Sequence, residues 1–208
     1  YGIQTLRAAE NFPISGYRAH PGLIRAIAMA KKAAALSNRE LGLLDKRRAD
    51  AIAAAAAEVI DGKWNDQFVV DVYQAGAGVS FHMNANEVIA NRAIELLGGK
   101  RGDYTVVHPN DHVNRSQSTN DVFPTAMRLA SLFLLEELHA ELQPMQRALE
   151  KKGKEFDRIV KSGRTHLMDA VPITLGQEFS GYASQLEHGI EAIEKALKPL
   201  LELALGAT

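Results

Sequence analysis

The sequence contains no cysteine, no long apolar run and almost no net charge. The missing cysteines exclude a disulfide scaffold, a cysteine nucleophile and cysteine-ligated zinc, and they are typical of a reducing compartment, so we expect a cytoplasmic protein. The longest apolar stretches, residues 51–57 and 129–135, are shorter than the roughly 20 residues of a membrane span. A formal charge of -1, from 24 basic and 25 acidic side chains, does not indicate a nucleic-acid surface. We therefore expect small-molecule partners, with no nucleic acid and no membrane.

The two ends of the 208 residues also lack features that complete chains usually have. Tyr1 to Thr5 contain no initiator methionine, no basic segment and no apolar core of a signal peptide. At the other end, a helical pattern stops at Gly206 without a closing element. We expect both ends to be cut from a longer chain.

Alanine-rich, periodic segments predict three helices in the first half of the chain: Pro21 to about Glu40, Asp45 to about Ile60, and His82 to about Leu97. Asp45 is a good N-cap, and the glycine pair at 98–99 is typical of a helix end. Small residues at 68–80, and glycine, proline and asparagine at 100–112, predict loops.

Two longer apolar stripes follow, with spacings of three and four residues. The first extends from Phe123 to Leu149 and predicts a long helix with a kink at Pro144, and the second extends from Leu175 to Leu200. A short loop around Gly163 is predicted between them. Helices on the order of 45 Å long carry more apolar surface than a two-helix hairpin can bury, so we expect an oligomer.

These patterns predict an all-α protein with two parts. Residues 1–119 would form an N-terminal helical domain, and residues 120–208 would form an incomplete bundle of long helices.

A glycine-rich segment, residues 74–87, is the first candidate site. Its small residues allow the backbone to approach a ligand closely. Ser80, His82, Asn84 and Asn86 lie where a helix is predicted to begin and where free N–H groups point outward. A glycine-rich turn with an asparagine cap is the alternative interpretation.

The polar run at residues 109–121 is the second candidate, and it leads into the most apolar helix of the chain. Its last six residues, Ser116 to Asp121, have more hydrogen-bond donors than one helix cap needs. Together with Arg115 and the positive end of the helix, they favour a carboxylate site. Simple capping by Ser118, Thr119 or Asn120 is the alternative.

A polar segment between the two long helices, residues 163–172, is the third candidate. A single loop histidine such as His166 is usually solvated or bonded to the backbone. However, polar segments at helix ends in an apolar bundle are how such bundles form ligand sites, and here there are three.

Metal binding and charged faces are less informative. His108 and His112 are four residues apart, but Pro109 lies between them and no carboxylate stands at ligand spacing, so we expect no metal site. The lysine pairs at 31–32 and 151–152 are interpreted as solvated faces.

Taken together, these segments resemble the N-terminal part of the aspartase/fumarase superfamily, and within it the aspartate ammonia-lyases. The resemblance covers essentially all 208 residues. The matching segments are Tyr1–Ala8, Glu10–Phe12, Asp66–Phe68, Met83–Val88, His108–Asn114, Ser116–Asp121, Gly163–His166 and Asp169–Pro172.

The resemblance implies a reversible elimination of ammonia from L-aspartate to give fumarate, without a cofactor. Ser118 and Thr119 would hold the β-carboxylate, and Thr165 would help to hold the α-carboxylate. Asn120 and His166 would contact the amine, with His166 as the catalytic candidate.

The resemblance also implies a secondary anion site and a shared active site. His108, Asn110 and Asp111 match a secondary anion site of fumarases. Family members form homotetramers whose active sites are built from three subunits. Their serine base lies on a loop whose motif this chain does not contain.

Three residues depart from the aspartase pattern. Ser80, in the glycine-rich segment, is assigned to substrate binding, but the family's threonine before it is Val79 here. His82 stands where aspartases have asparagine, and Met168 stands where they have glutamine. A related amino-acid lyase with an altered substrate therefore stays open as an alternative. Fumarate hydratase stays open as well, and the missing base leaves open a non-catalytic helical fragment.

Overall fold

The computed structural model describes residues 1–206, which form two units. One unit comprises Tyr1–Ser131 together with the described residues from Leu203 onward. The other comprises Leu132–Glu202. The domain boundary predicted from the sequence, at residues 119 and 120, stays a prediction.

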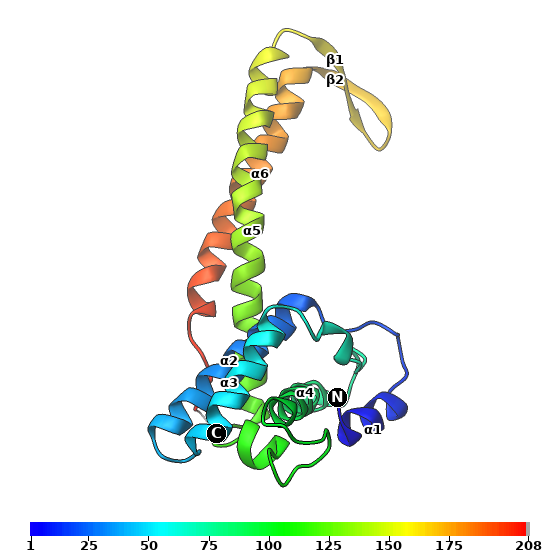
Figure 1. Ribbon diagram of the computed structural model, residues 1–208. Coiled ribbons are helices and arrows are strands. Elements are labelled where there is room, and N and C mark those ends of the chain that lie inside the picture. The colour runs from blue at the N-terminus through cyan, green and yellow to red at the C-terminus, as the bar shows by residue number, and fades with distance from the viewer. Residues whose placement is uncertain (207–208) are drawn as a thin grey trace. The chain divides into compact units, whose positions relative to one another are not determined.

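The first unit is helical (Figure 1). Its elements are α1 (Ile3–Asn11), α2 (Pro21–Glu40), α3 (Lys46–Ile60), the short 3-10 helices η1 (Asn65–Gln67) and η2 (Gly76–Gly78), α4 (Val79–Leu96) and the π-helical turn η3 (Pro109–Val113). The predicted bounds of α2 are confirmed, and Asp45 caps α3 by accepting the Arg48 N–H at 3.0 Å. Helix α1 was not predicted.

Helix α4 begins three residues earlier than we predicted. Its N-cap, Gly78, supplies no side chain, but the carboxamide oxygen of Gln74 accepts the N–H of Phe81. This bond satisfies one of the free donors of the first turn from outside the helix. Residues 79 and 80, which we assigned to a loop, are therefore helical.

Helices α2, α3 and α4 form the core of the first unit. Alanines at their contacts, including Ala28, Ala49 and Ala55, are fully buried. Because alanine has only a methyl group, the helix backbones can approach closely, while larger side chains such as Ile52 and Ile89 fill the remaining space.

The charged residue Lys31 lies within this core. We interpreted Lys31 and Lys32 as a solvated face, and this is wrong for Lys31, which is fully buried. Ile27, Lys31 and Ala35 succeed one another at four-residue spacing on the buried stripe of α2. Lys151 and Lys152, by contrast, are exposed as predicted.

A buried carboxylate holds α1 against α4. Glu87, which is 1% exposed, accepts the backbone N–H groups of Gly2 at 3.0 Å and Thr5 at 3.0 Å through one oxygen. The hydroxyl of Thr5 donates to the same oxygen at 2.6 Å, and the N–H of Gln4 donates to the other at 2.9 Å. The carboxylate thus satisfies free donors at the positive end of α1.

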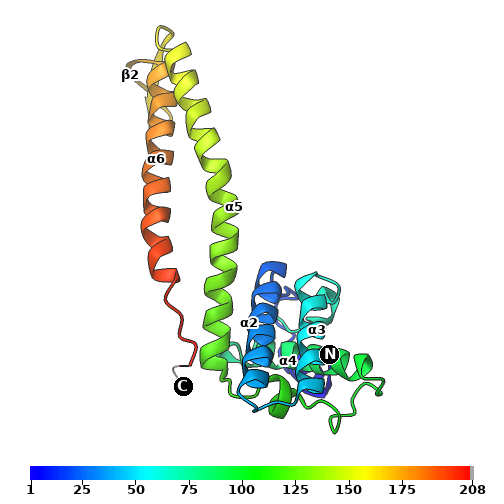
Figure 2. The same cartoon turned by 60° about the vertical axis from the view of Figure 1, so that its left-hand side comes forward.

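The second unit contains two long helices and a hairpin. Helix α5 (Thr119–Glu155) begins in the first unit and continues across Pro144, and α6 (Leu175–Leu200) runs beside its second part in both views (Figures 1 and 2). Between them, strands β1 (Val160–Thr165) and β2 (Met168–Thr174) pair antiparallel. The predicted loop around Gly163 is therefore wrong, although the all-α class is confirmed because these two short strands are the only ones in residues 1–206.

Small residues allow α5 and α6 to cross closely. A Cβ added at Gly176 would lie 2.4 Å from the carbonyl oxygen of Gly153. Beside this crossing, the rings of Phe156 and Phe179 pack edge to face at 5.4 Å. Elsewhere on the pair, Leu138 and Met145 are about half exposed. The predicted oligomer would cover them and stays a prediction.

Among the described residues, no helix is both long and apolar enough to cross a bilayer.

Candidate functional site

Two of the three candidate segments meet at the beginning of α5. Gly78 has a φ of +77°, and a Cβ added there would lie 2.3 Å from the ring of Phe123. The ring of Phe81 contacts the same ring edge to face at 5.9 Å. The glycine-rich turn therefore packs directly on the first turns of α5, and only glycine fits at position 78.

Ser118 performs the capping that we considered as the alternative. Its carbonyl accepts the N–H of Val122 at 3.0 Å, and its hydroxyl oxygen accepts the N–H of Asn120 at 3.2 Å. The hydroxyl proton of Ser118 is not used by this cap and can donate to a ligand. Thr119 is half-buried and Asn120 is exposed. One of the three side chains is thus sufficient for the cap, which leaves the other two for another role.

Thr119 is bonded to a buried histidine. Its Oγ1 lies 2.7 Å from Nδ1 of His82, which projects from the first turn of α4 and is 2% exposed. Both residues belong to candidate segments of the sequence, but we did not predict their contact.

Behind His82 lies the buried Lys31, which we did not predict as a site residue. Its Nζ is 2.5 Å from Nε2 of His82, 2.7 Å from Oδ1 of Asn114 and 2.9 Å from Oε1 of Gln117. Three acceptors match the three protons of an ammonium group. The helical spacing of Lys31 with buried apolar residues was the signal that could have revealed it.

The two amides are oriented by their own donors. Nδ2 of Asn114 donates to the carbonyl of Gln117 at 3.2 Å. Nε2 of Gln117 donates to the carbonyls of Val113 at 3.0 Å and Arg115 at 3.1 Å. Since both amide nitrogens bond to carbonyls, both amide oxygens face Lys31.

The electrostatics favour a neutral imidazole at this site. Burial, and then the neighbouring Lys31, lower the pKa of His82 from 6.5 to about 3. Burial also lowers the pKa of Lys31 well below its usual value. Near neutral pH, His82 therefore carries a single ring proton.

The other residues of the glycine-rich segment have simpler environments. Ser80 is half-buried on the first turn of α4, and the adjacent Val79 is 50% exposed and has no hydroxyl. Asn84 has a structural role, because its oxygen accepts the N–H of Val69 at 3.1 Å and its nitrogen donates to the carbonyl of Gln67 at 3.0 Å.

The predicted secondary anion site forms a compact turn. Nδ1 of His108 accepts the N–H groups of Asn110 and Asp111, each at 3.2 Å, and the ring packs against Tyr104. These two backbone donors are thus already bonded to the histidine, while the side chains of Asn110 and Asp111 are exposed. Anion binding at this turn stays a prediction.

The third candidate segment belongs to the other unit. Thr165 is the last residue of β1, and His166 and Leu167 form the two-residue turn, with φ of 48° and 62°. Positive φ at both positions is typical of a type I′ hairpin turn. Thr165 and His166 are both exposed, and their contact with substrate stays a prediction.

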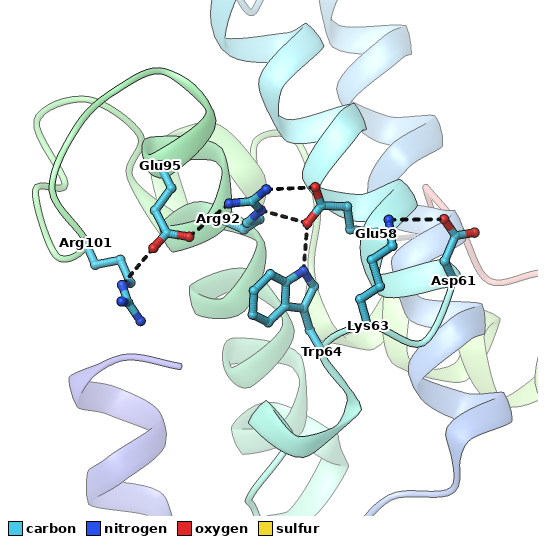
Figure 3. Close-up of polar contacts among 7 residues, drawn as sticks. All are labelled: Glu58, Asp61, Lys63, Trp64, Arg92, Glu95 and Arg101. Atoms are coloured by element: carbon cyan, nitrogen blue, oxygen red, sulfur yellow. Dashed lines mark hydrogen bonds and ion pairs between the residues drawn. The ribbon is translucent and has the colours of Figure 1, made fainter.

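A separate polar cluster links α3 to α4 (Figure 3). Arg92 donates to both carboxylate oxygens of Glu58, at 2.7 and 2.9 Å, and Trp64 Nε1 donates to Glu58 at 2.9 Å. Glu95 lies between Arg92, at 3.2 Å, and Arg101, at 2.8 Å. These charges are paired with one another, so the cluster joins two helices and is a poor candidate for a ligand site.

Comparison with known proteins identifies the family of the chain. A family model described as "Lyase" matches residues 1–208. The chain belongs to this lyase family. Its place in the aspartase/fumarase superfamily is thereby confirmed.

The relatives carry more than one name. The chain is 56% identical over 208 residues to an aspartate ammonia-lyase from Bacillus sp and 58% identical over 209 residues to a class II fumarate hydratase from Halobacterium salinarum. Each match covers 100% of this chain and 44% of the relative. Among solved structures, it is similar to a "fumarate lyase:delta crystallin" from Brucella melitensis, with a TM-score of 0.92 and 53% identity over 100% of this chain and 49% of that one.

The chain thus spans about half the length of these relatives and matches their N-terminal part. The names support a lyase, and they do not decide between aspartate and malate as the substrate.

Proposed function

We propose that the protein containing this chain is an aspartate ammonia-lyase, which converts L-aspartate to fumarate and ammonia. The observation that carries the proposal is the pair of hydroxyls at the start of α5. Ser118 keeps a hydroxyl proton beyond its capping bond, and Thr119 is held by a buried histidine. Both stand at the positive end of a 37-residue helix.

The chemistry requires donors of this kind. A base removes a proton from the carbon beside the β-carboxylate, and the electron pair moves onto that carboxylate, which becomes doubly charged. The pair then forms the carbon–carbon double bond as ammonia leaves from the neighbouring carbon. Preorganised donors that face the extra charge lower the barrier, by about 3 to 4 kcal/mol for one donor in the best-studied oxyanion site.

The other assignments complete this proposal. Asn120 and His166 contact the amine, with His166 in the catalytic role, and Thr165 and Ser80 bind substrate. The secondary anion site is His108, Asn110 and Asp111. The whole protein is a cytoplasmic homotetramer whose subunits share each active site, and a base from outside this chain completes it.

Fumarate hydratase is the second candidate function. Val79 favours a related lyase with an altered substrate instead, because a hydroxyl expected for aspartate binding is missing at a half-exposed position. The class II fumarate hydratases among the relatives are as similar to this chain as the aspartate ammonia-lyases are.

Assays of the full-length protein with each substrate test the proposal. With L-aspartate, we expect fumarate, followed by its ultraviolet absorbance, and an equal amount of ammonia. Turnover of malate without turnover of aspartate would replace the proposal with fumarate hydratase. If neither substrate reacts, the proposal is wrong.

A matched pair of variants tests the role of Thr119. Thr119→Val removes a donor, so we expect the kcat/KM for aspartate to fall about 100-fold, as for one oxyanion donor. Thr125→Val is the control on the same helix. Thr125 is buried, and its hydroxyl has no hydrogen-bond partner among residues 1–206, so its loss should leave kcat/KM unchanged.

A further variant tests the substrate. Val79→Thr restores the missing hydroxyl, and a gain in kcat/KM for aspartate relative to malate would favour a protein with an altered substrate. If no substrate responds to this change, Val79 does not set the specificity.

A further inference from the structure

We propose that His82 is a positioning residue, which orients the hydroxyl of Thr119 as a donor toward the substrate carboxylate, and that Lys31 sets the tautomer of His82 for this task. Two consecutive hydrogen bonds link the three side chains. One joins Lys31 Nζ and His82 Nε2 at 2.5 Å, and the other joins His82 Nδ1 and Thr119 Oγ1 at 2.7 Å. This inference rests on the proposed function only in taking a carboxylate as the ligand of Thr119.

The direction of each bond follows from the donors available. We take Lys31 to be an ammonium ion, because three acceptors surround its Nζ, although burial lowers its pKa. An ammonium ion has no acceptor, so Lys31 then donates to His82 and Nε2 is the unprotonated ring nitrogen. The single ring proton of the neutral imidazole then lies on Nδ1. Nδ1 donates it to Oγ1 of Thr119, so the hydroxyl accepts on this side and its own proton points elsewhere.

The result is a hydroxyl of fixed polarity. A threonine hydroxyl normally rotates and can present either its proton or a lone pair to a ligand. With its acceptor side occupied by His82, Thr119 presents its proton, which suits a carboxylate oxygen and disfavours an ammonium group. The same site would thus distinguish the carboxylate end of an amino acid from its amine end.

Burial protects this polarity. Lys31 is fully buried and His82 is 2% exposed, so water does not provide alternative partners for the ring. The Asn114 and Gln117 oxygens take the other two protons of Lys31, which leaves its third N–H for His82. Without Lys31, the ring could carry its proton on Nε2 and accept the Thr119 proton, and this would remove the donor from the substrate side.

The tautomer can be measured directly. Full-length protein labelled with ¹⁵N in its histidine rings, studied by solid-state NMR without substrate, should show His82 with a protonated Nδ1 and a bare Nε2. The His82→Gln variant assigns the signal by its disappearance. A proton on Nε2, or on both nitrogens, would overturn the inference.

Two replacements of His82 separate its contacts. Asparagine places an amide nitrogen near the position of Nδ1 and can still donate to Thr119, whereas glutamine reaches the position of Nε2 and can still accept from Lys31. We expect His82→Asn to keep kcat/KM for aspartate within about threefold, and His82→Gln to lose about tenfold, the value of one hydrogen bond. If His82 only filled space, the smaller asparagine would be the more damaging, and this outcome would refute the inference.

A double-mutant cycle tests whether His82 acts through Thr119. Once Thr119→Val has removed the hydroxyl, His82→Gln should cause no further loss, because the two changes remove one function. If the losses of kcat/KM caused by His82→Gln and Thr119→Val were additive, the inference would be overturned. Lys31→Met should lower kcat/KM as His82→Gln does, and Lys32→Met, at the half-buried next position, is its control.

Failure of the inference and failure of the proposed function give different results. A protonated Nε2 together with normal aspartate turnover overturns the positioning role alone. A protonated Nδ1 in a protein that neither binds nor converts a dicarboxylate refutes the proposed function, and the carboxylate step of the inference with it.

Discussion

Replacement of Glu87 by glutamine should release α1 from α4. The buried carboxylate accepts four donors, three on one oxygen and one on the other. In the Glu87→Gln variant, the amide oxygen can replace the carboxylate oxygen that accepts three donors. The amide nitrogen then faces the N–H of Gln4, so two donors oppose each other.

The expected cost follows from these contacts. An unsatisfied buried N–H costs about 1 to 3 kcal/mol, and the three remaining bonds each weaken by about 1 kcal/mol because their acceptor is no longer charged. The neutral amide is easier to bury, which offsets part of this loss. We expect a net loss of about 3 to 5 kcal/mol, which corresponds to opening of α1 that is at least about 100-fold more frequent.

Hydrogen exchange measured by mass spectrometry is the appropriate assay, because the loss is local. Peptides that cover α1 in the full-length protein should exchange faster in Glu87→Gln, while peptides from α3 should change little. Glu10→Gln is the matched control, since Glu10 is an exposed residue of α1. Exchange of α1 that matches the control would refute the reasoning.

Three further predictions concern stability, measured by urea unfolding. Gly78→Ala should destabilise by about 2 to 5 kcal/mol through its positive φ and its clash with an aromatic ring, whereas Gly76→Ala, which has open space, should change little. Gly176→Ala should destabilise the long-helix unit, whereas Gly181→Ala, on the same helix with nothing within 4 Å, should stabilise it by up to about 1 kcal/mol. Hydrogen bonds from Arg92 lower the pKa of Glu58 from 4.5 to about 2. The contribution of the Glu58 carboxylate to the free energy of unfolding is therefore fully present above about pH 4.5 and is lost as the pH falls through about 2. Glu58→Gln should remove this contribution to the pH dependence of the free energy of unfolding. A variant whose stability has the same pH profile as the original protein would contradict the prediction.

The sequence predicted most helices because helix signals are local. Proline at the first position of α2, the aspartate cap of α3 and the glycine pair after α4 each act within one or two helical turns. The start of α4 was misplaced because its cap comes from Gln74, outside the helix. The hairpin was missed because its turn has His166 and Leu167 at positive φ instead of the usual asparagine and glycine.

The candidate site was predictable in part for a similar reason. Ser118, Thr119 and Asn120 stand out because a polar run before an apolar helix is visible within one segment. Lys31 was misread, because pairs of lysines are usually solvated and its partners lie 51 to 86 residues away in the sequence.

The helical class, most helix bounds, the superfamily and the polar segments were predictable from the sequence, since these depend on periodicity, caps and short motifs. The hydrogen bonds that join Lys31, His82 and Thr119, and the contacts by which Glu87 anchors α1, became visible only in the folded structure. These contacts depend on which helix faces pack together, and a buried polar group becomes favourable only when distant partners satisfy its hydrogen bonds.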